Sequence, residues 1–205
     1  MEKIAAAGTG GKHTDNIAKN ITAILKPENK LPQPFSVQVP YNTKPEMTSI
    51  NLPHEMFASV YCEYPDAFTR IFHPDTGASI AFWNSQEGHP QMDNRPIKER
   101  SDYKEKCTAL GMHGDEVPVT EIGKSGCQLF LTFSFFSLLA GAVSTLDSMV
   151  WIWGVFEKFI LPGEHGTIDI FMSILTWSFY WLWLGKWPTE DWRGNAKLIL
   201  QITYD

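Results

Sequence analysis

The sequence predicts an α+β protein in which a two-helix transmembrane hairpin follows an N-terminal β-containing cytoplasmic region and precedes a short C-terminal strand. Three observations predict this fold: two long apolar segments between residues 121 and 187, a proline–glycine turn between them, and tryptophans crowded at the end of the second. Four regions are predicted: a flexible N-terminal region with a short helix (1–34), a soluble β-containing region (35–120), the hairpin (121–187) and a cytoplasmic tail (188–205).

Composition excludes several classes of protein. The chain of 205 residues has a formal net charge of −6 and no basic run, so nothing indicates a nucleic-acid partner. Its three cysteines show no CxxC spacing, which predicts reduced thiols and neither a disulfide framework nor a zinc site. The first residues lack the apolar core of a secretory signal, so an internal span would have to direct insertion into a membrane.

The N-terminal half is predicted to alternate short helices and strands. Asp15 is placed to cap a short helix with an apolar face, and prolines end that helix before the chain alternates apolar and polar residues over 35–39 like a strand. Residues 57–64 are also predicted to be a strand, and 67–83 a β-hairpin that turns at 74–77. The charged stretch 95–106 is a candidate helix.

The first predicted span begins at about Gln128. The run from Leu129 to Leu146 contains no charged residue, and roughly 18–20 residues at about 1.5 Å each would cross a hydrocarbon core of roughly 30 Å. The alternative is a buried helix of a water-soluble protein, which would need a polar stripe that this run lacks beyond Ser and Thr. Small residues at three-to-four spacing predict a helix-packing stripe, either within the hairpin or between copies of the chain: Ser134, Ser137, Gly141 and Thr145.

The segment Ser148–Leu161 places its apolar residues on one helical face. It is predicted either to lie along the membrane surface or to lengthen the first span. After a turn at 162–166, the second span is predicted over Ile168–Leu184, and Pro188 stops it. The strand-like stretch 196–204 closes the chain. Aromatic rings prefer the headgroup level, which predicts these interfacial anchors: Trp151, Trp153, Trp177, Trp181, Trp183 and Trp187.

Charge placement predicts the orientation of the hairpin. Lysines and arginines flank both spans, whereas the connecting loop holds only Lys158, so both termini are predicted on the cytoplasmic side of a multi-pass inner-membrane protein. Asp147 and Asp169 are the possible functional carboxylates of this region. Both are predicted at the outer interface, unless a shifted first span buries Asp147 in mid-membrane, where it could couple to protons or ions.

Motifs for chemistry are weak. Residues Gly8–Thr14 resemble a phosphate-binding loop, but His13 stands where the loop requires Ser or Thr. The sequence His113-Gly114-Asp115-Glu116 is the densest group of potential metal ligands, without an HExxH or HxH pattern. The sequence therefore predicts no catalytic residue, no cofactor site and no metal site.

The function expected from this architecture is that of a non-enzymatic, membrane-anchored interaction protein. Its architecture resembles that of bacterial inner-membrane accessory proteins of secretion or toxin–immunity systems, and the resemblance is one of architecture only. The expected partners are the lipid bilayer and either another protein or further copies of the chain. A membrane-perturbing or pore-forming effector that uses 148–161 is the first alternative, and a small transporter that depends on Asp147 is the second.

Overall fold

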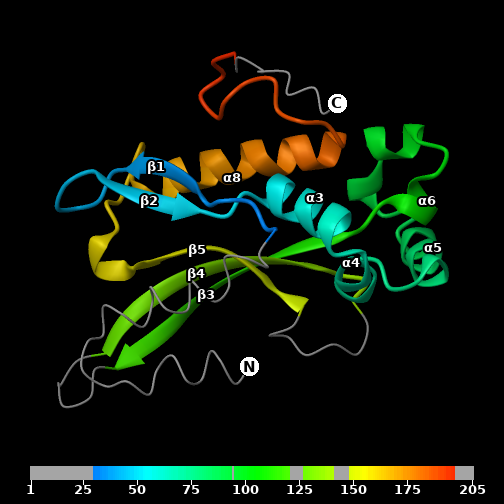
Figure 1. Ribbon diagram of the computed structural model, residues 1–205, viewed down its shortest axis with the longest axis horizontal. Coiled ribbons are helices and arrows are strands. Elements are labelled where there is room, and N and C mark those ends of the chain that lie inside the picture. Colours follow the sequence, from blue (N-terminus) through cyan, green and yellow to red (C-terminus); the bar gives the residue numbers. More distant parts are fainter. Residues whose placement is uncertain (1–29, 94, 121–126, 141–147, 197–205) are drawn as a thin grey trace. The chain divides into compact units, whose positions relative to one another are not determined.

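The computed structural model describes residues 30–93, 95–120, 127–140 and 148–196. The chain divides into two units, Met1–Leu31 and Pro32–Asp205, and the helices and strands of the described residues all belong to the second. These residues form a mixed α+β fold with a two-stranded and a three-stranded antiparallel sheet (Figure 1). The predicted α+β class is therefore confirmed, whereas the described residues contain one apolar helix of sufficient length and do not show the predicted two-helix transmembrane hairpin.

The first hairpin was partly predictable. Strand β1 (Phe35–Val39) has the predicted bounds and pairs antiparallel with β2 (Glu46–Ile50). Its alternating pattern buries Val37 and Val39, and Ile50 is buried on β2, so one face of the hairpin joins the core. The sequence patterns did not identify β2, because Met47 and Ile50 are the only large apolar residues of this strand.

The strands predicted over 57–83 are wrong, because this part of the chain is helical. It forms α3 (Pro53–Glu63), α4 (Pro65–Ile71) and α5 (Thr76–Ser85). Pro53 and Pro65 begin their helices, where proline is tolerated because the missing N–H has no partner within the helix. The residue interpreted as a hairpin turn, Asp75, is the N-cap of α5, and its carboxylate accepts hydrogen bonds from the amides of Gly77 and Ala78 at 3.1 and 3.0 Å.

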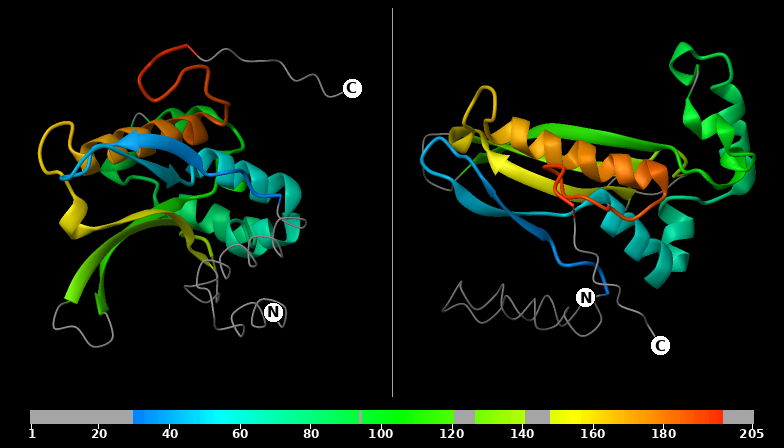
Figure 2. Two further views of the ribbon diagram at one scale, coloured as in Figure 1. Left: turned by 60° about the vertical axis from the view of Figure 1, so that its left-hand side comes forward. Right: turned by 90° about the horizontal axis from the view of Figure 1, so that it is seen from above.

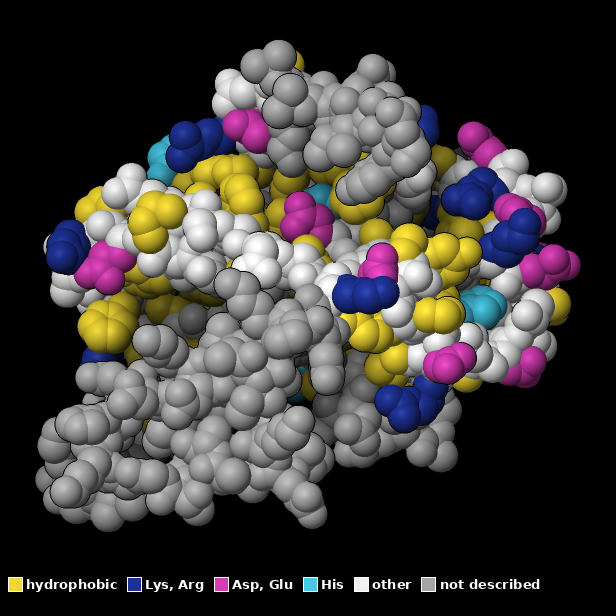
Figure 3. All heavy atoms as spheres, viewed as in Figure 1, with side chains coloured by type: hydrophobic (Ala, Val, Ile, Leu, Met, Phe, Trp, Pro, Cys, Tyr) yellow, Lys and Arg dark blue, Asp and Glu magenta, His cyan; other side chains and the backbone are white. Residues whose placement is uncertain are grey.

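The charged stretch before the second sheet is partly helical, as expected. It contains the short helices η2 (Pro96–Glu99) and α6 (Tyr103–Lys106), which follow η1 (Pro90–Met92). A small cluster of Trp83, Tyr103, Ala109 and Leu139 holds α5 and α6 together. The Trp83 indole also donates to the Cys107 carbonyl at 2.9 Å. Figure 3 shows positive and negative side chains intermingled over this part of the surface.

The helix predicted from Leu129 to Leu146 is wrong over its described part. Residues Cys127–Ser137 form strand β4, the central strand of a sheet with β3 (Leu110–Thr120) on one side and β5 (Val150–Phe156) on the other. A central strand that is apolar on both faces produces a continuous apolar run, which periodicity alone does not distinguish from a buried or membrane helix. The helix-packing stripe also fails, because Ser134 and Ser137 lie on β4, while Gly141 and Thr145 lie outside the described residues.

The amphipathic helix predicted over Ser148–Leu161 is also wrong. This segment contains β5 and the short helix η3 (Glu157–Phe159). A register irregularity between Phe133 and Ser134 leaves Ile152 as the extra residue of β5, and its carbonyl accepts a hydrogen bond from the Asn51 amide at 3.0 Å. The bulge shifts the alternation of apolar residues and leaves a pattern that also matches one face of a helix.

Helix α8 (Thr167–Leu184) confirms the second apolar helix. It ends at Gly185, which adopts the left-handed conformation (φ 63°) of a helix C-cap. Within the described residues, α8 alone is long and apolar enough to cross a membrane. Figures 1 and 2 show α8 beside α3 and over one face of the β3–β4–β5 sheet. Its buried face packs on this sheet through Phe171, which lies 4.7 Å from the Phe133 ring and 4.5 Å from the Trp153 ring.

Candidate functional site

The two faces of the three-stranded sheet have different environments. On the inner face, Phe133 and Trp153 pack against α8, and Phe135 stacks on Phe72 at 5.8 Å. All of these side chains are buried. Because successive side chains of a strand point to opposite faces, the residues between them on β4 point to the other face. We call that other face the open face.

The open face carries aromatic, aliphatic and polar side chains and remains partly exposed. Directly paired residues of antiparallel strands share a face, so the registers assign its members. Val117 and Trp151 keep 43% and 47% of their surface exposed. The residues of the open face are Gly111, His113, Asp115, Val117 and Val119 on β3, Gln128, Phe130, Thr132, Ser134 and Phe136 on β4, and Trp151, Gly154 and Phe156 on β5.

Two glycines of the open face leave room for phenylalanine rings of β4. A Cβ atom on Gly111 would lie 2.8 Å from Phe136 Cζ, and one on Gly154 would lie 2.5 Å from Phe130 Cζ. The two phenylalanine rings therefore lie directly over the neighbouring glycine backbones. Phe130 also packs on Phe156 with ring centroids 5.0 Å apart. The rings of β4 and β5 form the aromatic layer of the open face, in which Thr132 and Ser134 separate Phe130 from Phe136.

The outer edge of β3 borders the open face. The carbonyl of Ala109 accepts a hydrogen bond from the Leu138 amide at 2.8 Å, so odd-numbered residues of β3 direct their N–H and C=O groups toward β4. Even-numbered residues direct theirs away from β4. Among the described residues, β3 pairs with β4 alone. Pro118 is even-numbered, so its missing N–H costs no bond within the sheet.

Two exposed carboxylates lie near the middle of this edge. Asp115 and Glu116 are both exposed, and the Asp115 carboxylate accepts a hydrogen bond from the Glu116 amide at 2.9 Å. His113 and Asp115 point to the open face, whereas the Glu116 side chain points to the opposite one. The part of the chain that the structure describes holds no group of three potential metal ligands. The glycine-rich motif Gly8–Thr14 lies outside that part.

A serine–histidine pair joins α3 to α8. The Ser178 hydroxyl lies 2.8 Å from His54 Nδ1 and accepts from the His54 amide at 3.2 Å, while Glu55 Oε1 lies 3.9 Å from His54 Nε2. Ser178, His54 and Glu55 therefore follow the order of a nucleophile, a base and a carboxylate in a catalytic triad. However, both Ser178 and His54 are buried, and Trp177 and Trp187 pack against the imidazole at 5.2 and 6.0 Å. We therefore assign these groups to helix packing.

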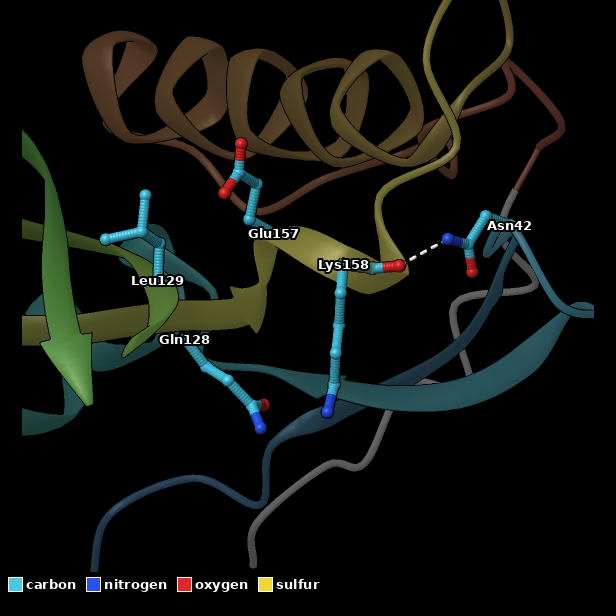
Figure 4. A pocket seen from close by; sticks show the side chains of 5 residues that line it. All are labelled: Asn42, Gln128, Leu129, Glu157 and Lys158. Atoms are coloured by element: carbon cyan, nitrogen blue, oxygen red, sulfur yellow. Dashed lines mark hydrogen bonds between the residues drawn. The ribbon is translucent and has the colours of Figure 1, made fainter. Parts of the chain in front are cut away.

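A hollow of about 390 Å³ lies between the β1–β2 turn and η3 (Figure 4). The Asn42 side chain donates to the Lys158 carbonyl at its rim. The Gln128 amide and the Lys158 ammonium point to one side of the hollow, whereas Glu157 points to the other. Glu157 and Lys158 are both exposed, so solvent screens their charges. We assign no reaction to this arrangement.

The predicted anchors divide into two groups. Trp153, Trp177 and Trp181 are buried in the protein, so the prediction that they contact lipid is wrong for these three. Trp151 is exposed on the open face, and α8 and the segment after it expose Tyr180, Trp183 and Trp187. Asp169 is exposed at the start of α8 and accepts a hydrogen bond from the His165 amide at 2.8 Å. Asp147 and the strand predicted over 196–204, apart from Ala196, lie outside the described residues.

Comparison with family models, curated proteins and solved structures finds no match for this chain. The candidate site therefore depends on the geometry of the chain itself. Sequence patterns had not identified the open face, because they assigned its central strand to a membrane helix. The available signal was the alternation Thr132-Phe133-Ser134-Phe135 within the apolar run, which has the period of a strand.

Proposed function

We propose that this protein is a non-enzymatic accessory protein that binds another protein through the open face of its three-stranded sheet. The observation that carries the proposal is the exposure of Val117 and Trp151 beside the aromatic layer of Phe130, Phe136 and Phe156. An antiparallel sheet with one face on the core usually presents polar residues on the other. Exposed apolar and aromatic side chains gathered on one face of a sheet are instead typical of an interaction surface.

The composition of the open face also supports protein binding. Tryptophan and other aromatic side chains are enriched at the centres of protein interfaces, where they contribute much of the binding energy. Trp151 supplies such a side chain on β5, and polar groups of Thr132 and Ser134 lie between the rings of β4. These hydroxyls can donate and accept hydrogen bonds with a partner without placing a charge at the centre of the interface.

Charge indicates the chemistry of the partner. Asp115 and Glu116 place negative charge at the β3 margin of the face, and the chain as a whole carries a net charge of −6. Two copies of an acidic chain repel each other, which disfavours a homodimer through this margin. The expected partner presents an apolar surface with lysine or arginine at its rim, because complementary charges accelerate and orient association.

The experiment is site-specific photo-crosslinking in cells that naturally contain the protein. A benzophenone amino acid replaces Val117 or Trp151, and matched control chains carry it at the exposed α8 positions Ser173 or Thr176. The proposal predicts one protein adduct that forms from both open-face positions and from neither α8 position. The adduct partner is then purified, and its affinity is measured for the unmodified chain and for variants.

The variants decide whether the adduct reports binding. Val117→Asp together with Trp151→Asp is expected to weaken the affinity at least about tenfold, because both changes place a charge in an apolar contact. Ser173→Asp together with Thr176→Asp should leave the affinity unchanged, and circular dichroism should show the same fold for both variants. Equal adduct formation from all four positions, or equal affinity of both variants, would contradict the proposal.

Contact with a bilayer is the second candidate function, and α8 provides its supporting observation. Tyr180 and Trp183 are exposed at the C-terminal end of the helix that is long enough to cross a membrane, and Trp187 is exposed just after it. Vesicle flotation separates the two candidates. Lipid would be the partner if the full chain floats with the vesicles, if the changes Trp183→Ser and Trp187→Ser abolish this flotation, and if the change Val117→Asp does not. The membrane-perturbing alternative loses its amphipathic helix, because β5 occupies that segment.

A further inference from the structure

We propose that the outer edge of β3 receives a basic β-strand of the partner protein, which extends the sheet by one strand. This inference depends on the proposed function and specifies how the partner is recognised. Extended segments bind sheet edges through main-chain hydrogen bonds, and the alternating side chains add specificity. The three steps of the argument are the hydrogen-bonding groups of the edge, its usable length and its charge.

The hydrogen-bonding groups of the edge follow from the pairing of β3 with β4. Because the Ala109 carbonyl bonds the Leu138 amide, the even-numbered residues of β3 turn their backbone groups away from β4. Leu110, Met112 and Gly114 therefore offer both N–H and C=O groups along the outer edge. A row of such groups is a template for a further strand.

The usable length ends before Pro118. Pro118 has no N–H to donate, and the outward N–H of Glu116 already donates to the Asp115 carboxylate at 2.9 Å. The second half of the edge is therefore blocked for donation, whereas the first half remains open. The added strand should pair with the stretch from Leu110 to Glu116 and leave the sheet before Pro118.

Charge selects a basic strand over a second copy of β3. If a second β3 paired antiparallel over Leu110–Glu116, Gly111 would lie opposite Asp115 and Leu110 opposite Glu116, so neither carboxylate would meet a positive charge. Like charges directly opposite each other destabilise a sheet, whereas opposite charges stabilise it. A strand with lysine or arginine opposite Asp115 and Glu116 satisfies both carboxylates, one on each face of the sheet.

The test uses the full chain and short valine-rich peptides with two adjacent lysines, which can lie opposite Asp115 and Glu116 on the two faces of the sheet. A matched peptide carries glutamate in place of lysine, and a third carries N-methyl groups on alternate amides of the lysine sequence. Binding is followed by fluorescence anisotropy, and amide exchange is followed by NMR. The lysine peptide should bind and slow exchange at Met112 and Gly114. The glutamate peptide should bind at least about fivefold more weakly, and the N-methyl peptide should not bind.

Two variants separate edge pairing from general charge attraction. Met112→Pro removes an outward N–H without removing a bond to β4, so it should weaken peptide binding about tenfold while the circular dichroism spectrum is kept. If that variant does not fold, Glu116→Lys provides the test, because it should weaken the lysine peptide and strengthen the glutamate peptide. Binding of the lysine peptide without protection of Met112 and Gly114, or no binding at all, would overturn strand addition.

The outcomes also distinguish this inference from the proposed function. If Val117 and Trp151 form cross-links but amide exchange at Met112 and Gly114 is not slowed, the open face remains a binding surface and the added strand is rejected. If amide exchange at Met112 and Gly114 is slowed but those cross-links do not form, the open face is rejected as the site of a natural partner. Absence of both would reject the two proposals together.

Discussion

The ring of Phe133 on β4 lies 4.7 Å from the ring of Phe171 on α8, and Trp153 stacks on the same Phe171 at 4.5 Å. This contact assigns one face of the sheet to the core and leaves the other face open. It also gives α8 a packing partner within the protein. The apolar character of the inner face of β4 and of the buried face of α8 is therefore explained by a sheet and a helix that pack together.

Removal of the Phe171 ring should destabilise the fold strongly. Phe171→Ala would leave a cavity between Phe133 and Trp153, and phenylalanine-to-alanine changes in cores cost about 3–5 kcal/mol of unfolding free energy. Denaturant titration of the purified chain measures this value. Ser173→Ala, at an exposed position of the same helix, is the control and should change stability by less than about 0.5 kcal/mol. Equal stability of the two variants would show that α8 does not pack on the sheet.

Removal of the Ser178 hydroxyl should loosen the junction of α3 with α8. Ser178→Ala would deprive the buried His54 of a hydrogen bond to its ring and another to its amide. Loss of a partner to a buried polar group costs about 1–3 kcal/mol. The exposed neighbour Thr176→Ala is the matched control. A Ser178→Ala variant as stable as this control would be inconsistent with the assignment of the pair to helix packing.

The Glu87–Lys104 ion pair should make stability depend on pH. The hydrogen bond and the positive charge of Lys104 lower the pKa of Glu87 below its ordinary value of 4.5, and they raise the pKa of Lys104. Because the folded-state pKa of Glu87 is lowered, its contribution is complete above the unfolded value and is lost as pH falls through the folded one. Glu87→Gln should therefore lower the melting temperature at pH 7.

The same destabilisation should disappear at acidic pH. Below the folded-state pKa the carboxyl is protonated in both states, so Glu87→Gln and the unmodified chain should melt alike. The effect at pH 7 should be small, because the pair is exposed and screened. Glu105→Gln, at an exposed position of α6, is the control. A Glu87→Gln effect that stays constant from pH 7 to acid would show that the carboxylate charge is not its cause.

The sequence allowed part of the fold to be predicted, and the failures have identifiable physical causes. Strand β1 and helix α8 were predicted because each has one buried face, so its apolar period matches its own geometry. Strand β4 carries apolar rings on both faces, with Phe133 and Phe135 inward and Phe130 and Phe136 on the open face. The two-residue alternation of a strand is therefore hard to recognise in this segment, and the apolar run is as long as a membrane span.

The helices α3 and α5 were predicted as strands for a different reason. Their apolar runs are short and contain β-prone residues such as Val60 and Ile80, and short runs do not discriminate between the two structures. The informative signals were Pro53 at a first helical position and Asp75 as an N-cap. The candidate site was missed because its definition requires the strand register.

The most direct test of the sheet is a scan of cysteine accessibility along β4 in water without detergent. Single cysteines replace residues 129–136 in a chain whose native cysteines are changed to serine, and each is reacted with a water-soluble maleimide. The sheet predicts alternation, with fast reaction at Phe130, Thr132, Ser134 and Phe136 and slow reaction at Phe133 and Phe135. A helical period near 3.6 residues, or uniform protection of all eight positions, would contradict it.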